Sequence, residues 1–183
     1  GGSSGIGKRI AGMLAESGHA VIATYNRHVC ESSPTIQYHF LDVLEDAPDL
    51  HFLPETLDGV VYCPGSIRLM PFQRIKPPDF LTDYRINVEG AVKILQAVLP
   101  RLKNSHSPSV VLFSTVAASL GLPYHSLVSA SKGAVEGLAR ALAAEWAPAI
   151  RVNCIAPSLT DTPLAASLIN TPEKKKLTPT VTR

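Results

Sequence analysis

Short apolar runs and longer stretches with a helical period alternate along the chain. Apolar runs bounded by Gly, Pro or polar residues occupy positions 19–25, 35–41, 57–63, 109–113 and 150–155. Runs of this length that are rich in β-branched and aromatic residues are typical of buried strands. We therefore predict five strands.

Three further segments carry apolar residues at intervals of three and four, which is the period of an amphipathic helix. They cover residues 5–17, 78–99 and 126–146. Ser17-Gly18 closes the first segment with a helix stop signal. Strands and helices that alternate at this spacing predict an α/β fold with a doubly wound, Rossmann-like parallel sheet in three layers.

One connection is too short for this pattern. Only a loop that contains Pro34 separates the predicted strands at 19–25 and 35–41. Parallel strands are usually joined by a dozen or more residues, most often through a helix. We therefore expect no full crossover helix between these two strands.

Composition narrows the class of protein. The chain has 183 residues, of which 45% are apolar and 17% charged, as in soluble globular proteins. We expect one domain, residues 1–183. The net charge is +2 and the one basic cluster is residues 174–176, so we expect neither nucleic acid nor a membrane surface as a partner. No apolar run reaches the ~18 residues that span a bilayer.

The cysteines point to a reducing compartment. Cys30, Cys63 and Cys154 are widely spaced, and they form neither a CxxC pair nor a metal-ligand pattern with the histidines. We therefore expect no metal site, reduced thiols and a cytoplasmic location.

The strongest local motif is the loop GGSSGIG at residues 1–7, directly before the first predicted helix. Glycines let the backbone approach a pyrophosphate, and the start of the helix offers amide donors and the positive end of a dipole. This loop alone also fits a methyltransferase-like Rossmann protein. It therefore indicates a dinucleotide or related ligand without choosing between them.

Further motifs follow the loop. Asp42-Val43 ends the strand at 35–41, Asn87 lies in the second helical segment, SASK ends at Lys132, and PSLTDT covers 157–162. In order and spacing these motifs resemble the short-chain dehydrogenase/reductase family over nearly the whole chain. The resemblance implies an oxidoreductase that interconverts a small-molecule carbonyl and an alcohol by hydride transfer with NADP or NAD.

The resemblance also implies that the chain is incomplete at both ends. The family's first strand precedes the glycine loop and its last strand follows the matched region. We expect both to be missing, with residues 177–183 as a divergent tail. In the family the two long helices often join subunits, so apolar stripes at 78–99 and 126–146 suit a homodimer or homotetramer, although they suit cover of the sheet equally.

The family pattern assigns contacts with the nicotinamide cofactor to positions along the whole chain. They are Gly1, Ser3, Ser4, Gly5, Ile6, Gly7, Asn26, Arg27, Asp42, Val43, Cys63, Pro64, Gly65, Lys132, Pro157 and Thr162. Some have a plainer interpretation. Asp42 alone is typical of a loop cap, and a Tyr-Cys-Pro-Gly turn at 62–65 replaces the family's Asn-Asn-Ala-Gly.

The catalytic residues match only in part. Lys132 corresponds to the Lys of the family's YxxxK pair, Asn87 to the Asn that organises a proton-relay water, and Thr115 to the catalytic Ser. Four residues before Lys132, where the family has its proton-donating Tyr, stands Val128. Valine cannot donate a proton, and losing a general acid costs on the order of 10² to 10⁴ in rate.

Two nearby side chains are candidates for a replacement donor. Tyr124 and His125 precede the third helical segment. On a continuous helix Tyr124 would lie about 12 Å from Lys132 along the axis, and its side chain would lean away. Both residues could instead line the substrate mouth or cap the helix.

Asn26-Arg27 follows the strand at 19–25, where an acidic residue would favour NAD. Because a guanidinium pairs well with a 2′-phosphate, Arg27 favours NADP over NAD, unless it is simply a solvated loop residue. We carry forward two functions: an active oxidoreductase, and a dinucleotide-binding module with impaired catalysis. The SASK helix and the PSLTDT turn argue against a methyltransferase.

Overall fold

The computed structural model describes residues 1–168. The basic cluster at 174–176 and the tail at 177–183 lie outside the described residues. Two compact units make up the chain: Gly1–Leu41 with the residues from Pro157 onward form the first, and Asp42–Ala156 form the second. The expectation of one domain stays a prediction.

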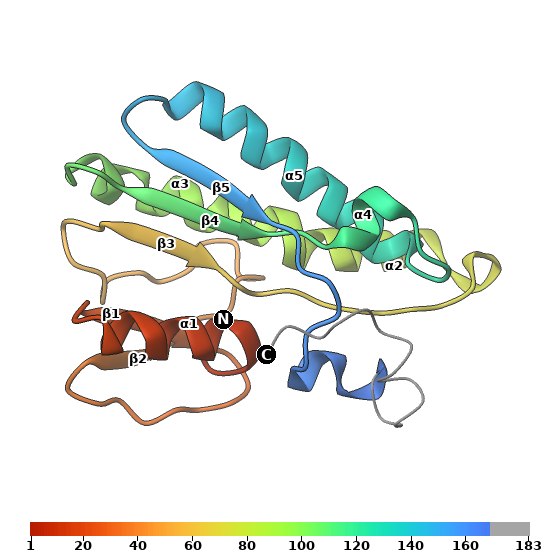
Figure 1. The fold of residues 1–183 in the computed structure, drawn as a ribbon, viewed down its shortest axis with the longest axis horizontal. Helices are drawn as coiled ribbons and strands as arrows, with labels where there is room; N and C mark the ends of the chain where they lie inside the picture. Colours follow the sequence, from red (N-terminus) through yellow and green to blue (C-terminus); the bar gives the residue numbers. More distant parts are fainter. Residues whose placement is uncertain (169–183) are drawn as a thin grey trace. The chain divides into compact units, whose positions relative to one another are not determined.

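The first unit contains a helix and a pair of parallel strands (Figure 1). Helix α1 covers Gly5–Glu16, strand β1 covers Val21–Tyr25 and strand β2 covers Ile36–Phe40. Val21 is opposite Ile36 in a parallel ladder. The connection at 26–35 holds no helix, as predicted from its length. A short 3₁₀ helix, η3, follows at Pro163–Leu168.

Helix α1 ends where the stop signal predicts. Gly18 has φ of +85°, a left-handed conformation that glycine adopts without steric cost. The Gly18 N–H donates to the Ala15 carbonyl, and the His19 N–H donates to the Leu14 carbonyl, both at 3.0 Å. These two bonds form the Schellman motif that closes many helices.

The second unit is built on a three-stranded parallel sheet. Its strands are β3 (Gly59–Tyr62), β4 (Ser109–Phe113) and β5 (Arg151–Ile155), in the order β3-β4-β5. All five predicted strands are therefore present and parallel, which confirms the Rossmann-like α/β class. The described strands form two hydrogen-bonded sheets, one in each unit.

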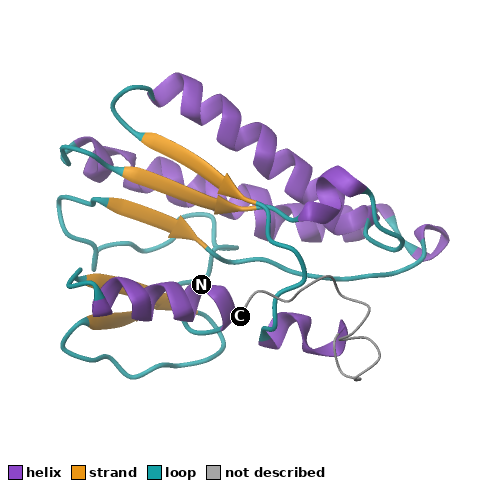
Figure 2. Cartoon of the chain, viewed as in Figure 1, coloured by secondary structure: helices purple, strands orange, loops and turns teal. Residues whose placement is uncertain are grey.

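Helices of the second unit are drawn in purple in Figure 2. Helix α5 spans Ser126–Trp146, the range predicted from the sequence. The other predicted segment is longer and divided: α2 (Pro77–Tyr84) leads into a π-helical turn, η2 (Arg85–Glu89), and then α3 (Gly90–Lys103). The sequence did not predict the two short helices η1 (Phe72–Arg74) and α4 (Val116–Leu120).

Helices α3 and α5 run along the same side of the three-stranded sheet (Figure 1). Their apolar stripes are buried within the single chain, through residues that include Ala91, Ile94, Leu95, Val98, Leu102, Leu127, Val128 and Val135. Covering the sheet therefore accounts for these stripes.

The inner side of α2 and of the turn after it is polar. Tyr84 is 46% exposed, whereas Asp83 and Asn87 are 5% and 1% exposed. A period of apolar residues cannot detect buried positions of this kind. A polar inner face on a helix next to a sheet is a reason to look for a functional site there.

Candidate functional site

The glycine loop lies tightly against strand β1. A Cβ on Gly2 would sit 2.7 Å from the Ala23 Cβ, and the Gly2 N–H donates to the Thr24 carbonyl at 2.7 Å. Ser4 is the N-cap of α1, yet its side chain makes no capping hydrogen bond, and the first turn holds no acidic residue. The first amides of α1 therefore keep the donor capacity that suits an anion.

The segment that begins at Pro157 belongs to the same unit and reaches this loop. A Cβ on Gly5, which has φ of +52°, would lie 3.4 Å from the Thr162 Cβ. The Thr162 hydroxyl accepts from the Ala165 N–H at 3.3 Å. Two motifs that are far apart in the sequence, the glycine loop and PSLTDT, are thus neighbours in the first unit.

The loop after β1 carries the residues predicted to choose the cofactor. Asn26 and Arg27 are both exposed. No ion pair involves Arg27 within the described part of the chain. The Cys30 thiol donates to the Ser3 carbonyl at 3.7 Å, which holds this loop beside the glycine loop.

In the second unit, Asp42 and Val43 begin a loop that precedes β3. One Asp42 oxygen accepts from the Leu44 N–H at 2.9 Å, so Asp42 does act as a loop cap. Its other carboxylate oxygen can still accept from a ligand. Val43 packs near Gly90, where an added Cβ would be 3.1 Å from the Val43 Cβ.

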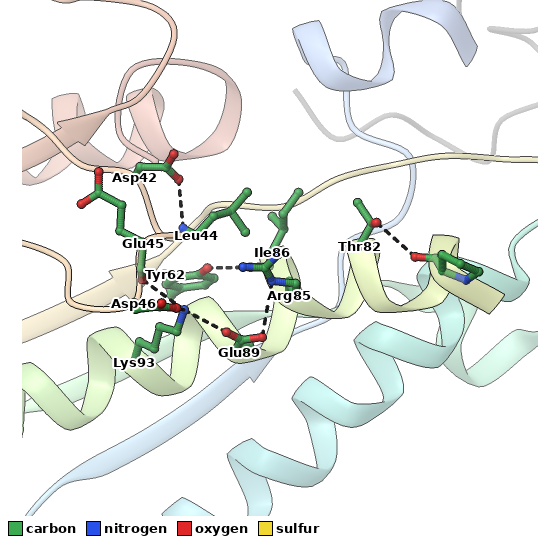
Figure 3. A network of polar contacts seen from close by, with 11 residues as sticks. Asp42, Leu44, Glu45, Asp46, Tyr62, Thr82, Arg85, Ile86, Glu89 and Lys93 are labelled. Carbon is green, nitrogen blue, oxygen red and sulfur yellow. Dashed lines mark hydrogen bonds and ion pairs between the residues drawn. The ribbon is translucent and has the colours of Figure 1, made fainter. Parts of the chain in front are cut away.

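Lys93 of α3 holds this loop in place (Figure 3). Its ammonium donates to the Glu45 carbonyl at 3.0 Å and lies 3.7 Å from the Asp46 carboxylate. On its own helix it pairs with Glu89 at 2.8 Å. The Lys93 side chain is only 17% exposed, whereas the Asp46 side chain is fully exposed, so the hydrogen bond to the Glu45 carbonyl is the main link between the loop and α3.

The π-turn η2 is supported by a side chain from strand β3. In this turn the Gly90 N–H donates to the Arg85 carbonyl, five residues back. Returning from π to α spacing leaves one helix carbonyl without its usual partner. The Tyr62 hydroxyl donates to the Ile86 carbonyl at 2.6 Å (Figure 3), and burial raises the pKa of Tyr62. Tyr62 thus satisfies a carbonyl at the irregular part of the helix.

Asn87 lies within the π-turn and is only 1% exposed, so it is not a surface polar residue. Its amide nitrogen is within hydrogen-bond distance of Ser66 Oγ (3.1 Å), the Asp83 carbonyl (2.9 Å) and Asp83 Oδ2 (3.2 Å). Its amide oxygen is buried and has no partner among the described residues. An unpaired buried acceptor marks a place for a ligand or a water.

Lys132 of α5 reaches the same place. Its ammonium donates to the Phe113 carbonyl at the end of β4, at 2.9 Å. A Cβ on Gly65 would lie 3.2 Å from Asn87 Oδ1 and 3.5 Å from Lys132 Nζ. Glycine at 65 therefore leaves open the space next to both groups, and Cys63 and Pro64 lead the chain into this position.

The charge of Lys132 is set by opposing influences. Burial lowers the pKa of the Lys132 ammonium from its usual value, while the negative charge of Asp83 and, less strongly, of Cys154 and Cys63 raises it. Burial also raises the pKa of the Cys63 thiol. Burial therefore disfavours the charged form of Lys132 while Asp83 favours it, and the group lies close to an unpaired amide oxygen.

The positions that correspond to the family's Tyr and Ser keep only one hydroxyl. Val128 lies one turn before Lys132 on α5 and is 4% exposed. Thr115 is the N-cap of α4, and its hydroxyl accepts from the Ala117 N–H at 3.3 Å. The Thr115 hydroxyl can still donate, but it is the one hydroxyl retained from the family's Ser-Tyr pair.

Neither candidate for a replacement donor lies on helix α5. Tyr124 precedes the helix with φ of +67° and is 58% exposed. His125 is the N-cap, and its Nδ1 lies 2.7 Å from the Pro123 carbonyl. Because the helix starts at Ser126, the shared helix face considered for Tyr124 and Lys132 does not exist.

Four residues near these positions were missed by the sequence reasoning: Tyr62, Ser66, Asp83 and Lys93. An Asp or Lys in a helical segment is usually solvated, so its identity alone gives no signal. Among residues 1–168 no group of His, Cys, Asp and Glu could hold a metal ion, and the cysteines are free. No helix within that range is long and apolar enough to cross a membrane.

Comparison with known proteins identifies relatives. The model of the enoyl-(acyl carrier protein) reductase family matches residues 48–180. A tropinone reductase homolog of Arabidopsis thaliana is 32% identical over 96% of this chain and 72% of its own length. The chain spans between 37% and 72% of the length of four curated relatives that it matches.

Solved structures agree. Ligand-free aldohexose dehydrogenase of Thermoplasma acidophilum is 26% identical, with a TM-score of 0.83 over 96% of this chain and 72% of that one. A short-chain dehydrogenase of Shigella flexneri complexed with NADP is 28% identical, with a TM-score of 0.82 over 97% of this chain and 82% of that one.

Proposed function

This chain belongs to the short-chain dehydrogenase/reductase family, and from that membership we propose that it is a nicotinamide-dependent oxidoreductase that interconverts a carbonyl and an alcohol. The observation that carries the proposal is the pairing of a buried Lys132 with an unpartnered Asn87 oxygen beside Gly65. Catalysis in this chain is weakened at one position, Val128.

The residues present fit a dinucleotide. The first amides of α1 carry no side-chain cap and suit a pyrophosphate. Next to Gly65, the ammonium of Lys132 offers a donor for a ribose hydroxyl, and the amide oxygen of Asn87 offers an acceptor for a water. When bound, the dinucleotide supplies hydride transfer at its nicotinamide ring.

The protein's own part in the reaction is to bind, orient and manage protons. The Lys132 ammonium holds the ribose, the Thr115 hydroxyl donates to the substrate oxygen, and Asn87 Oδ1 holds a water next to Lys132. Val128 offers no proton to the alkoxide that forms at the substrate. We therefore expect turnover reduced on the order of 10² to 10⁴ relative to a chain with Tyr at this position.

The test is NADPH oxidation with a panel of ketones, compared with a Lys132→Ala variant. Turnover above that control supports an oxidoreductase. Equal rates in both proteins exclude it, whatever the binding of NADPH.

A second function is a dinucleotide-binding module without turnover, favoured by Val128 at the donor position and by Tyr62-Cys63-Pro64 in place of the family's turn. Fluorescence titration with NADPH distinguishes the two. Binding without turnover supports the module, and absence of binding removes both functions.

For the cofactor we propose NADP over NAD, because Arg27 is exposed directly after β1 and has no ion-pair partner within the described residues. The Shigella flexneri structure, 28% identical to this chain, is complexed with NADP, and a solved structure of the same fold that is 21% identical is complexed with NADH. Arg27→Ala should weaken NADPH binding about tenfold and leave NADH binding nearly unchanged. Equal losses for both cofactors contradict this assignment.

The remaining partners follow from the family. We propose a small-molecule carbonyl or alcohol as the substrate, a cytoplasmic location consistent with free thiols, and a homodimer or homotetramer. Because the stripes on α3 and α5 are already buried, association would use other parts of these helices. Sedimentation equilibrium tests this, and a monomer at all concentrations excludes it.

A further inference from the structure

A buried polar cluster lies beneath Gly65, formed by Ser66, Asp83, Asn87 and Lys132. Asp83 is 5% exposed and lies on α2, one helical turn before Asn87. Lys132 is 9% exposed and comes from α5. A carboxylate is rarely buried to this degree unless it is paired and hydrogen-bonded, so Asp83 needs an explanation that neither the fold nor the family pattern supplies.

The Asp83 carboxylate determines which groups in the cluster donate hydrogen bonds and which accept them. An ionised carboxylate only accepts, so Ser66, whose Oγ is 2.5 Å from Asp83 Oδ1, must donate its single proton there. The Ser66 oxygen is then an acceptor, and it takes a proton from the Asn87 amide nitrogen at 3.1 Å. Asp83 Oδ2 accepts from the same nitrogen at 3.2 Å.

This direction determines which way the Asn87 amide faces. Its nitrogen meets three acceptors on the side of Asp83 and Ser66, so its oxygen must face the other side. There it lies beside Gly65 without a partner among the described residues. With the amide reversed, its oxygen would face a carboxylate and a carbonyl, which is repulsive.

Charge in the cluster also depends on Asp83. Lys132 is buried, and the groups that act on it from the neighbouring elements are Asp83 of α2, Cys154 of β5 and Cys63 after β3. Of the influences that raise the pKa of Lys132, Asp83 is the largest. No direct ion pair joins Asp83 and Lys132 in the second unit, so the carboxylate acts through space.

We propose that Asp83 is a positioning residue for this site: it orients the Asn87 amide so that its oxygen faces Gly65, and its charge balances the buried Lys132 ammonium. The role concerns the site of the proposed function and rests on that function for its use in catalysis. Its physical content, an oriented amide and a charged Lys132, is measurable in the chain without cofactor.

The experiment is NMR of the ligand-free chain with labelled lysine and asparagine. The Lys132 side-chain signal is identified by its loss in Lys132→Met, and the Asn87 amide signals by their loss in Asn87→Ala. In Asp83→Asn we expect Lys132 to titrate at lower pH than in the native chain, and the Asn87 side-chain amide to shift and lose protection from hydrogen exchange.

Two further variants separate the parts of the proposal. Ser66→Ala removes the hydroxyl but keeps the carboxylate, so it should change the Asn87 amide signals and leave the Lys132 titration in place. Glu55→Gln removes an exposed carboxylate of the same unit and should change neither signal.

A folded Asp83→Asn chain in which Lys132 titrates as in Glu55→Gln, with unchanged Asn87 signals, overturns the proposal. If Asp83→Asn does not fold, unchanged Asn87 signals in Ser66→Ala overturn the orienting role by themselves. These readouts need neither NADPH nor a substrate. Failure of the proposed function would appear only in the binding and turnover assays.

Discussion

Lys132 and Val128 lie one turn apart on the buried face of α5, and their surroundings differ. The Lys132 ammonium donates to the Phe113 carbonyl, the Asp83 carboxylate acts on it through space, and the Asn87 amide oxygen lies beside the same Gly65. Position 128 offers no hydroxyl, and the Thr115 hydroxyl already accepts from the backbone of α4.

Under the proposed function, this difference means that cofactor binding and proton transfer depend on separate residues. A buried ammonium needs charge balance and hydrogen bonds, and Lys132 has the Asp83 carboxylate for the first and the Phe113 carbonyl for the second. A proton donor needs one hydroxyl at one position, and a single substitution removes it. The proposal therefore predicts that a chain without a proton donor at position 128 still binds the cofactor.

The largest expected effect is that of Val128→Tyr, which introduces a hydroxyl at the position of the family's proton donor. We expect turnover of ketones with NADPH to rise on the order of 10² to 10⁴. Val128→Phe adds similar volume without the hydroxyl and is the matched control for packing strain at this buried position. Equal turnover in the two variants would mean that proton donation is not what limits the native chain.

Lys132→Met tests the other half of the contrast. Removing the ammonium leaves the Asp83 carboxylate buried without its counter-charge, so the free energy of unfolding should fall on the order of 3 kcal/mol. Adding Asp83→Asn should restore part of this loss. Urea denaturation of both variants measures it, and losses that simply add would show that the two residues are not coupled.

The pH dependence of stability sharpens the same comparison. Burial lowers the pKa of Lys132 in the folded chain below the value of 10.5 that applies to the unfolded chain. Between these two values the unfolded chain binds more protons, so stability from this group rises with pH. The native chain should show this rise on the alkaline side and Lys132→Met should not; parallel pH profiles in urea denaturation would contradict it.

Tyr62→Phe should weaken the π-turn that holds Asn87 in its buried position. Without the hydroxyl the Ile86 carbonyl loses its donor, which should cost about 1 to 3 kcal/mol in unfolding free energy. Hydrogen exchange should also speed up at the Gly90 amide, which closes the π-turn. Tyr84→Phe removes a hydroxyl from an exposed residue on the adjoining helix and should change neither quantity. A Tyr62→Phe chain as stable as Tyr84→Phe would remove Tyr62 from this role.

Thr115→Ala has the smallest expected effect. It removes the N-cap of α4 and should cost about 1 kcal/mol, while Thr115→Ser keeps a capping oxygen and should cost little. Thermal unfolding measures both. A Thr115→Ser loss as large as that of Thr115→Ala would show that the methyl group of Thr115, not its oxygen, carries the stability.

Much of this fold could be predicted because its signals are local. Helix α5 has the predicted bounds because its Ala-rich apolar period stops at both ends, and β4 because a short β-branched run is bounded by polar residues. The position of Val128 followed from its spacing to Lys132. These predictions needed no information about distant parts of the chain.

The rest of the site depends on contacts between distant segments. Tyr62 and Ile86 are 24 residues apart and belong to a strand and a helix, so no local pattern links them. Asp83 has the composition of a solvated helix residue, and only packing makes it buried. The same holds for the π-turn, which has no sequence signature of its own.

The π-turn η2 also has a consequence for the length of this segment. A regular α-helix advances about 100° per residue, so an extra residue in it would rotate everything after it by that angle. The wider ring of the π-turn instead takes up one extra residue within Arg85–Glu89, so the faces of the helix before and after the turn are not forced apart. A deletion within α3 has no such turn to absorb it and would rotate the buried stripe of α3 away from the sheet. A library of one-residue deletions should therefore find residues 85–89 more tolerant than the middle of α3.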